Sequence, residues 1–394
     1  MIYLDNAATT RLDEGCLDII KEYGLNNFHN PSALYRKAME SGNAIKTARN
    51  IIAKSLGAKA DEIIFTASGS EGDNIALLCS LRAKSGKIVV GSSEHSAVYN
   101  TALELKVRGY DVVFAPCDKF GKTDLEKLAE ILDENVLLVS IMHVCNETGA
   151  LNDLSTISKL IKNKSPKAIF HSDGVQAYGK IAVNVKTLGV DLYTVSGHKV
   201  HAPKGIGALY CRSGIFLKTF VFGGGQENGI RSATENVSSI MAFADIVERS
   251  FFNIKSNYSK VEELRNYLAD KLLSTFDNLK INTDIKNSSP YVYSFAFNSA
   301  RGEVLVHCLE DKGIIVGTGS ACSAKRSTKR IPQALGISDD YSQGMIRISF
   351  CESNTKSEID AFISALSESL AELIKYQNKS VGKDDCILTR LKLR

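Results

Sequence analysis

Short apolar runs rich in β-branched residues alternate with longer amphipathic stretches over the first half of this chain. Seven of the runs are predicted to be strands, at residues 63–66, 87–90, 111–114, 136–141, 168–172, 192–195 and 207–211. Strands separated by helical stretches are typical of βαβ units, whose strands lie parallel in one sheet. The sequence therefore predicts an α/β fold with a mostly parallel seven-stranded sheet.

The pattern changes near residue 245, where a long charged helical stretch begins. The segments 292–298, 303–311 and 346–350 follow it and together suggest a smaller α+β domain. We expect a large domain over residues 15–248, a small domain formed by 1–14 and 249–378, and a basic tail over 379–394. The tail is expected to be a solvated or loosely docked end rather than an interaction arm.

Composition excludes several classes of protein. The chain has 394 residues and is 44% hydrophobic, but no apolar run is long enough for a membrane span, and the N-terminus lacks the features of a signal peptide. We therefore expect a cytoplasmic protein without a membrane partner. A net charge of +4 without a long basic run argues against nucleic acid as the main ligand.

The nine cysteines contain neither a C-x-x-C pair nor zinc-ligand spacing, so we expect free thiols, no disulfide framework and no bound metal. Most should be buried, and Cys16, Cys79, Cys211 and Cys308 are interpreted as small buried hydrophobic side chains.

Polar residues follow five of the predicted strands, where ligands of open α/β sheets collect. The five segments are Ala67 to Asn74, Glu94-His95, His143 to Gly149, Asp173 to Gln176 and Ser196-Gly197-His198-Lys199. The first is a turn of small residues opening a helix, which suits a phosphate but is also common as a plain helix cap. Lys199 could carry a Schiff base with an aldehyde cofactor. Pyridoxal phosphate also needs a carboxylate at its ring nitrogen, and Asp173 fits that requirement.

The order and spacing of these motifs resemble the NifS/IscS cysteine desulfurases, which are class V, fold-type I pyridoxal phosphate enzymes. The resemblance extends from Tyr3 to about Asp360. It rests on residues 3–10, 30–32, 94–95, 142–149, 173–176, 196–199, 203–205, 223–227, 231–236 and 319–322.

The resemblance implies a role for each site residue. Lys199 would bind the cofactor aldehyde and move the Cα proton, His95 would stack on the ring, and Asp173 would pair with the ring nitrogen. Gln176 and Asn146 would bond the O3′ oxygen, while Arg347, with Asn146, would bind the substrate carboxylate. The phosphate would be held by Gly69, Ser70, Ser196, His198 and Thr234 of the partner subunit, which implies a homodimer.

Cys322 determines the reaction that the resemblance implies. It lies in a run of small residues, 317–324, as expected for a mobile loop. Its thiolate would take sulfur from L-cysteine, leaving L-alanine and a persulfide on Cys322. An iron–sulfur scaffold or a tRNA-thiolation enzyme would then accept the sulfur.

Apart from a tolerable change in the phosphate turn at residues 67–71, four residues depart from the family pattern: Tyr35 stands for a histidine, Cys145 for an asparagine, Asn228 for an arginine and Cys351 for a glycine. Cys145 is interpreted as a buried bystander, with a second reactive thiol as the alternative. For the whole chain, a selenocysteine lyase, another enzyme of the class V family and a non-catalytic paralogue stay open as alternatives.

Overall fold

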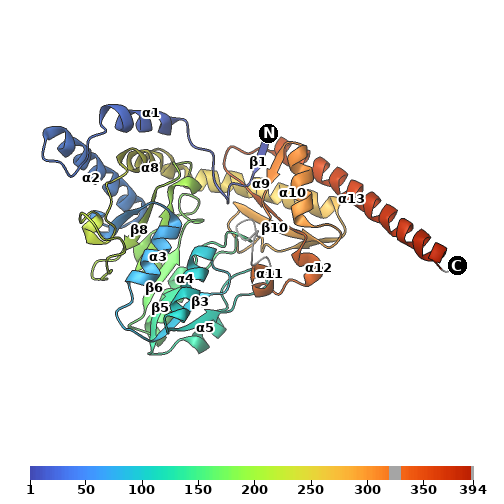
Figure 1. Ribbon diagram of the computed structural model, residues 1–394, viewed down its shortest axis with the longest axis horizontal. Coiled ribbons are helices and arrows are strands. Elements are labelled where there is room, and N and C mark those ends of the chain that lie inside the picture. The colour runs from blue at the N-terminus through green and yellow to red at the C-terminus, as the bar shows by residue number, and fades with distance from the viewer. Residues whose placement is uncertain (319–329, 392–394) are drawn as a thin grey trace.

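A seven-stranded sheet forms the centre of the larger part of the chain in the computed structural model, which describes residues 1–318 and 330–391 (Figure 1). The strands lie in the order β2-β8-β7-β6-β5-β3-β4, and β8 is antiparallel to both of its neighbours while the other pairs are parallel. The predicted mostly parallel seven-stranded sheet is therefore confirmed. The strands are β2 Ile63–Thr66, β3 Lys87–Gly91, β4 Asp111–Ala115, β5 Val136–Ser140, β6 Ile169–Asp173, β7 Leu192–Ser196 and β8 Gly207–Cys211.

Both faces of this sheet are buried, as its β-branched strands require. Val89 of β3 belongs to the hydrophobic cluster on one face, which includes residues of α2, α6 and α8, whereas Ile88 and Val90 belong to the cluster on the other face, which includes residues of α3 and α4. This alternation follows from the two-residue period of a strand. The helices of this part are α1 Gly15–Lys21, α2 Arg36–Leu56, α3 Gly69–Cys79, α4 Ser96–Val107, α5 Leu125–Ile131, α6 Leu154–Lys164, α7 Val185–Leu188 and α8 Val237–Ser250.

The smaller part contains an antiparallel sheet in the order β12-β10-β9 and a parallel pair formed by β1 and β11. Its strands are β1 Ile2–Leu4, β9 Leu279–Ile281, β10 Val292–Phe297, β11 Ile314–Val316 and β12 Met345–Ser349. Its helices are α9 Ile254–Thr275, α10 Gly302–Asp311, α11 Arg330–Ala334, α12 Asp339–Ser342 and α13 Lys356–Leu391. β1, β9 and β11 were not predicted, because three residues are too few to show a period.

The N-terminal segment after β1 joins the two parts. The Ala7 N–H donates to Ser349 Oγ at 2.8 Å, at the end of β12, and the Thr10 N–H donates to the His198 carbonyl at 2.9 Å, after β7. We call residues 5–10 the N-terminal strap. It connects the small sheet to the turn that carries Lys199.

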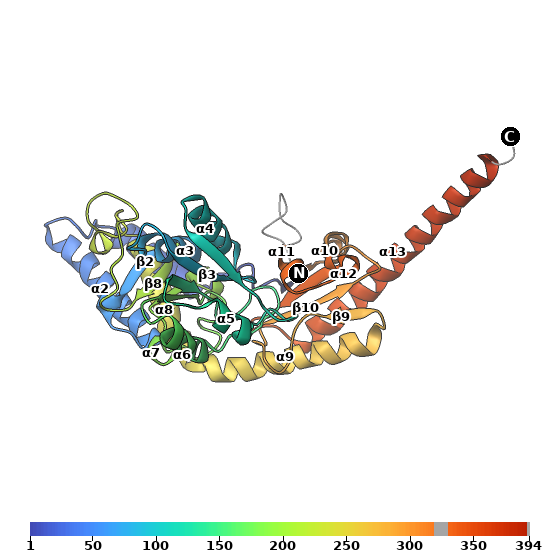
Figure 2. The same ribbon diagram turned by 90° about the horizontal axis from the view of Figure 1, so that it is seen from below.

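Helix α13 continues through residue 379 to Leu391, so the predicted tail begins inside a helix (Figure 2). Figures 1 and 2 both show the end of α13 projecting away from the rest of the chain. The domain boundaries at residues 14, 248 and 378 stay predictions. Among the described helices we find none that is both long and apolar enough to cross a bilayer.

Candidate active site

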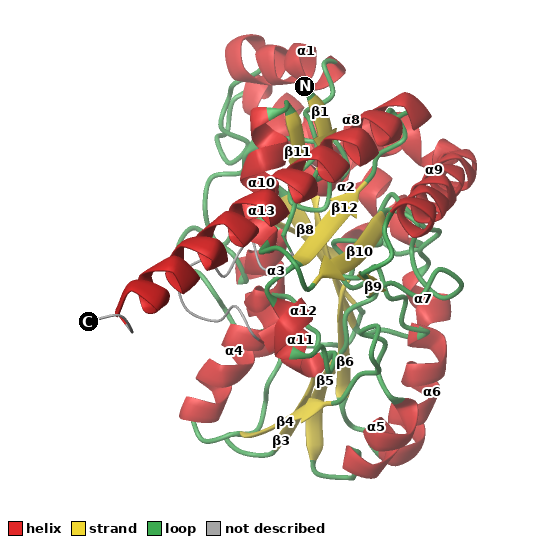
Figure 3. Cartoon of the chain, turned by 90° about the vertical axis from the view of Figure 1, so that its right-hand side faces the viewer, coloured by secondary structure: helices red, strands yellow, loops and turns green. Residues whose placement is uncertain are grey.

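The five predicted strand ends meet at one edge of the large sheet. β7, β6, β5 and β3 are consecutive parallel neighbours, so their carboxyl ends lie side by side. Thr66 at the end of β2 and Ser196 at the end of β7 both pair with Gly207 of β8. The end of β2 is therefore only one strand away from that of β7. Figure 3 shows β3, β4, β5 and β6 of this sheet in its lower part. Asp173 and Ser196 are the last residues of their strands rather than the first residues after them.

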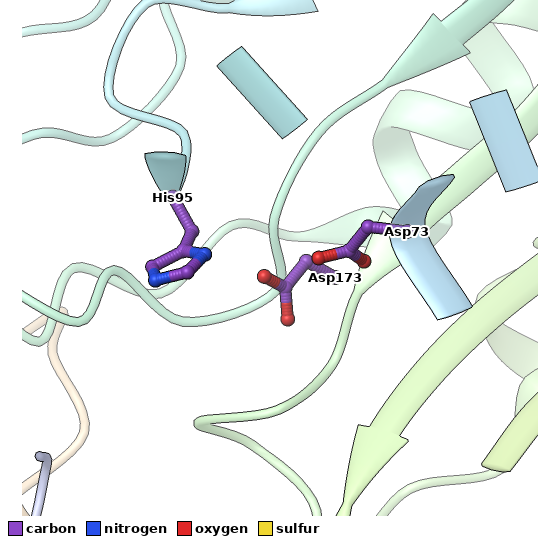
Figure 4. A group of neighbouring side chains, drawn as sticks. All are labelled: Asp73, His95 and Asp173. Carbon is purple, nitrogen blue, oxygen red and sulfur yellow. The ribbon is translucent and has the colours of Figure 1, made fainter. Parts of the chain in front are cut away.

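Asp173, His95 and Asp73 form a cluster at this edge (Figure 4). One ligand atom from each side chain lies within 4.8 Å of those of the other two. In Figure 4 the Asp173 carboxylate lies between the imidazole of His95 and the carboxylate of Asp73. Two carboxylates and an imidazole can also bind a metal ion, so the expected absence of a metal stays a prediction.

Burial controls the electrostatics of this cluster. It raises the pKa of Asp173, while His95, the Val175 N–H at 2.9 Å and Lys199 act in the opposite direction. Burial and then the charge of Asp173 raise the pKa of Asp73 well above its usual range, and burial lowers the pKa of His95. A desolvated carboxyl group of this kind gains much from a cation beside it. A protonated ring nitrogen would be such a cation.

Lys199 lies in the short 3₁₀ turn Gly197–Lys199 that follows β7. Its ammonium donates to the carbonyl of Ala7 at 2.5 Å and to that of Ala8 at 2.7 Å. Gln176, which follows β6, donates through Nε2 to the same Ala7 carbonyl at 2.9 Å. The N-terminal strap thus brings Lys199 and Gln176 to one oxygen atom, and it is part of the site.

The residues predicted to hold a phosphate lie around the start of α3. Ser68 caps the helix by accepting from the Glu71 N–H at 3.1 Å, and the first N–H groups of a helix have no partner within it. A Cβ on Gly69 would lie only 2.7 Å from Val175 Cγ2, so a larger residue at this position would require Val175 to move.

Ser196 Oγ is buried and has no hydrogen-bond partner among the described residues. A buried hydroxyl without a partner is unusual, and a phosphate oxygen beside α3 would satisfy it. A pocket of about 430 Å³ is lined by both Ser70 and His95. His198 Nδ1 lies 3.1 Å from Thr9 Oγ1 of the strap, and burial lowers the pKa of His198 to about 4. These residues fit the phosphate end of pyridoxal phosphate.

Arg347, on β12, is buried and already paired. Its Nη2 lies 2.9 Å from Asp5 Oδ1, and its Nη1 donates to the Asn146 carbonyl at 3.1 Å. Glu147 lies 3.7 Å away, and burial raises the pKa of Glu147 to about 7 although Arg347 lowers it. The Asn146 side chain donates to Glu147 Oε1 at 2.8 Å. An incoming carboxylate would therefore share the Arg347 guanidinium with Asp5 or displace the Asp5 carboxylate from it.

Cys322 lies outside the described residues, but the residues on either side of that segment reach the site. Gly317 and Arg347 exchange two backbone hydrogen bonds of 2.8 and 3.0 Å. Arg330 donates to the carbonyls of Ser92 and Glu94 at 3.1 and 2.7 Å, next to His95. The segment that carries Cys322 therefore begins and ends beside predicted site residues.

Thr234 is exposed in the loop that precedes α8. Arg231 of the same loop pairs with Glu71 in the first turn of α3 at 3.0 Å. The contact expected between Thr234 and the phosphate of a partner subunit stays a prediction.

Asn228 has a left-handed backbone with φ 57°. Asparagine adopts this conformation more readily than arginine does, which gives a physical reason for one departure from the family pattern.

The cysteine predictions are partly wrong. Cys16 and Cys79 are buried as expected, but Cys211, which packs against the outside of a core cluster, and Cys308 are only partly buried. Cys145 is fully buried, and burial raises the pKa of its thiol, as expected of a bystander. Cys351 is also buried, 3.1 Å from Ser353 Oγ. Tyr35 is exposed and contacts His29 edge-on.

Several residues of the site were not singled out from the sequence: Asp73, Glu147, Lys180 and Arg330. Each is a charged residue on a helix or in a loop, where charge normally indicates exposure. Asp73 and Lys180 are nonetheless almost completely buried, and nothing in their local sequence distinguishes them from surface residues.

A buried histidine lies beneath the cluster of carboxylates. His171 of β6 is fully buried, 2.8 Å from Ser140 Oγ and 3.1 Å from Thr194 Oγ1. Burial lowers its pKa to about 3 from the ordinary 6.5. The folded chain thus binds fewer protons than the unfolded chain between these values, so His171 makes folding less favourable as the pH falls below 6.5.

Replacing His171 with glutamine should remove this acid sensitivity. We expect H171Q to lose about 2 kcal/mol less unfolding free energy than the wild type between pH 7 and pH 5. Urea unfolding at the two pH values measures the difference. H307Q is the matched control because the His307 side chain is 77% exposed. Equal losses in H171Q and the wild type would show that His171 is not neutral in the folded state.

Comparison with known proteins gives consistent results. The family model Aminotransferase class-V matches residues 2–362. A cysteine desulfurase from Nostoc sp. is 37% identical over 388 residues, covering 97% of this chain and 96% of that protein. The solved structure of a NifS-like protein has a TM-score of 0.89 at 33% identity and covers 94% of this chain and 99% of its own. A structure of SspA in complex with cysteine has a TM-score of 0.78 at 29% identity and covers 90% of this chain and 100% of its own.

Proposed function

This chain belongs to the aminotransferase class-V family, and from its likeness to the cysteine desulfurases within it we propose that it removes sulfur from L-cysteine. The resemblance predicted from the motifs is confirmed, as are the fold and the enzyme class that it implied. The observation that carries the proposal is the buried Asp173 carboxylate beside His95 and within electrostatic reach of Lys199.

Pyridoxal phosphate is the cofactor that these residues fit. When bound, it supplies an electron sink for the negative charge that develops at the substrate Cα. Asp173 would keep the ring nitrogen protonated, His95 would cover the ring, and Gln176 and Asn146 would bond its O3′ oxygen. Ser196, Ser70, His198 and the N–H groups at the start of α3 would hold the phosphate.

Four residues would act on the substrate itself. Arg347 would orient the carboxylate of L-cysteine, with the neighbouring Asn146 assisting. The Lys199 amine would bind the cofactor aldehyde and later move the Cα proton. The Cys322 thiolate would attack the substrate sulfur, and the carbon–sulfur bond would break with its electron pair passing to carbon. Protonation then yields L-alanine and leaves a persulfide on Cys322. The structure of SspA with cysteine, a similar protein, supports this substrate.

The persulfide needs an acceptor, which we propose to be an iron–sulfur scaffold or a tRNA-thiolation enzyme. We also propose a homodimer, in which Thr234 of the partner subunit completes the phosphate site. Exposed apolar side chains on the large part support a second copy: Leu25, Phe28, Leu34, Met39 and Phe222. The cytoplasmic location stays a prediction.

Replacing Cys322 with serine tests the reaction. We expect alanine and persulfide formation from L-cysteine to fall by about 10³-fold, because serine cannot accept sulfur. The yellow absorbance at about 420 nm should remain, since Cys322 does not hold the cofactor. C308S is the control with an unaffected rate, because Cys308 lies on α10, which carries none of the predicted site residues. Alanine formation at the wild-type rate in C322S would contradict the proposal.

The same assay separates the alternatives. A transaminase of this family would keep its rate in C322S and transfer the amino group rather than release sulfur. A selenocysteine lyase would prefer selenocysteine over cysteine as substrate. A non-catalytic paralogue would lack the absorbance of bound cofactor in the wild-type protein.

A further inference from the structure

A buried lysine that has no part in the reaction above lies beside the site. Lys180 is 5% exposed, and its ammonium faces the ring of Tyr291 at 5.8 Å. Burial and then the charge of Lys199 lower its pKa to about 7. A charged group is costly to bury unless it is well paired. Its position therefore needs an explanation.

Lys180 has a polar partner that belongs to the proposed cofactor site. Its Nζ donates to Gln176 Oε1 at 2.8 Å, and the other end of the same amide, Nε2, donates to the Ala7 carbonyl at 2.9 Å. Gln176 and Gly179-Lys180 lie in one turn after β6, so the contact is local. The amide is thus held at both ends.

These two contacts allow only one orientation of the Gln176 amide. The Ala7 carbonyl can only accept, and the Lys180 amino group, which donates to Gln176 Oε1, can only donate when it is protonated. If the amide turned over, its oxygen would face the Ala7 oxygen and its NH₂ group would face the ammonium. The observed orientation uses one N–H for Ala7 and leaves the second N–H of the amide for another acceptor.

We propose that Lys180 is a positioning residue, which fixes the Gln176 amide so that its second N–H is presented to the O3′ oxygen of the cofactor. The inference rests on the proposed function, because that function supplies the oxygen. Lys180 itself does not touch the cofactor in this arrangement. It acts only through Gln176.

The experiment follows the cofactor spectrum rather than the rate. A donor at O3′ stabilises its negative charge and so lowers the pKa of the cofactor chromophore. Replacing Lys180 with methionine, which has similar length and no donor, should raise that pKa by about half a unit or more and weaken cofactor binding by about 3-fold to 10-fold. The measurement is a pH titration of the absorbance at about 420 nm in the protein loaded with pyridoxal phosphate.

Two further variants distinguish positioning from a general structural effect. In a Q176L background the K180M change should leave the chromophore pKa where Q176L alone puts it, because Lys180 acts through the amide. K204M, at an exposed lysine after the same strand as Lys199, should leave the wild-type value. If K180M does not fold, K180Q serves, since it keeps a polar side chain that can also accept. It should shift the pKa in the same direction by less.

Three outcomes would overturn the inference. A wild-type chromophore pKa in K180M, or in K180Q if K180M does not fold, would remove the role of Lys180 while the proposed function stands. Additive shifts of K180M and Q176L would show that Lys180 acts by a different route. A wild-type protein that never acquires the absorbance would reject the proposed function, and this inference with it.

Discussion

Replacing Lys199 with alanine is expected to lower the turnover of L-cysteine by about 10⁴-fold or more, since no other residue would bind the cofactor aldehyde and move the Cα proton. The absorbance of the bound cofactor at about 420 nm should disappear as well. The Ala8 carbonyl would also lose its Lys199 donor, and the Ala7 carbonyl would keep only Gln176, so a modest loss of stability should accompany the loss of activity. Rate and spectrum are measured on the purified protein with added cofactor.

Two variants control for this prediction. K199R keeps a cation near the strap but cannot bind an aldehyde as an amine does, so it should be as inactive as K199A. K204A changes an exposed lysine five residues further along the chain and should behave as the wild type. Activity of K199A within tenfold of the wild type would reject the assignment of Lys199.

Replacing Arg347 with alanine is expected to raise the KM for L-cysteine by about 100-fold, because the substrate carboxylate loses its guanidinium partner. The same change leaves Asp5 unpaired and removes the cation nearest to Glu147, and the side chain is only 5% exposed. We therefore also expect the unfolding free energy to fall by about 3 kcal/mol. Steady-state kinetics and urea unfolding measure the two effects separately.

Arg265 offers a matched control for Arg347. It is another buried arginine of the small part, and it donates to the Ile285 carbonyl at 3.0 Å, away from the site. R265A should therefore lose stability without a change in KM. If R347A only lost stability, as R265A should, Arg347 would be structural and the carboxylate would bind elsewhere.

The large sheet could be predicted well from the sequence because each strand is a buried apolar run followed by a polar segment. The predicted ends of the strands agree with the observed ends within one residue, and this accuracy is sufficient to place Asp173 and Lys199 at the same edge of the sheet. Strand order and the antiparallel direction of β8 could not be predicted, since they depend on contacts between segments far apart in the chain.

The least predictable part of the site is made of backbone. Ala7 and Ala8 contribute only their carbonyl oxygens, and an alanine carries no signal of such a role. Asp73 and Lys180 were missed for a different reason. A charged residue in a helix or turn normally faces water, and only the packed fold shows that these two are buried.

The N-terminal strap also has a consequence for synthesis of the protein. Ala7 is held by Ser349, 342 residues later in the chain, and contacts this distant in sequence form late. A growing polypeptide on the ribosome can complete β7 and bring the strap to the turn that carries Lys199, but the Ser349 end of the strap still lacks its partner at that stage. The strap that supplies the backbone acceptors of Lys199 is thus held at both ends only after Ser349 has been made, so we expect the catalytic centre to become rigid late in synthesis.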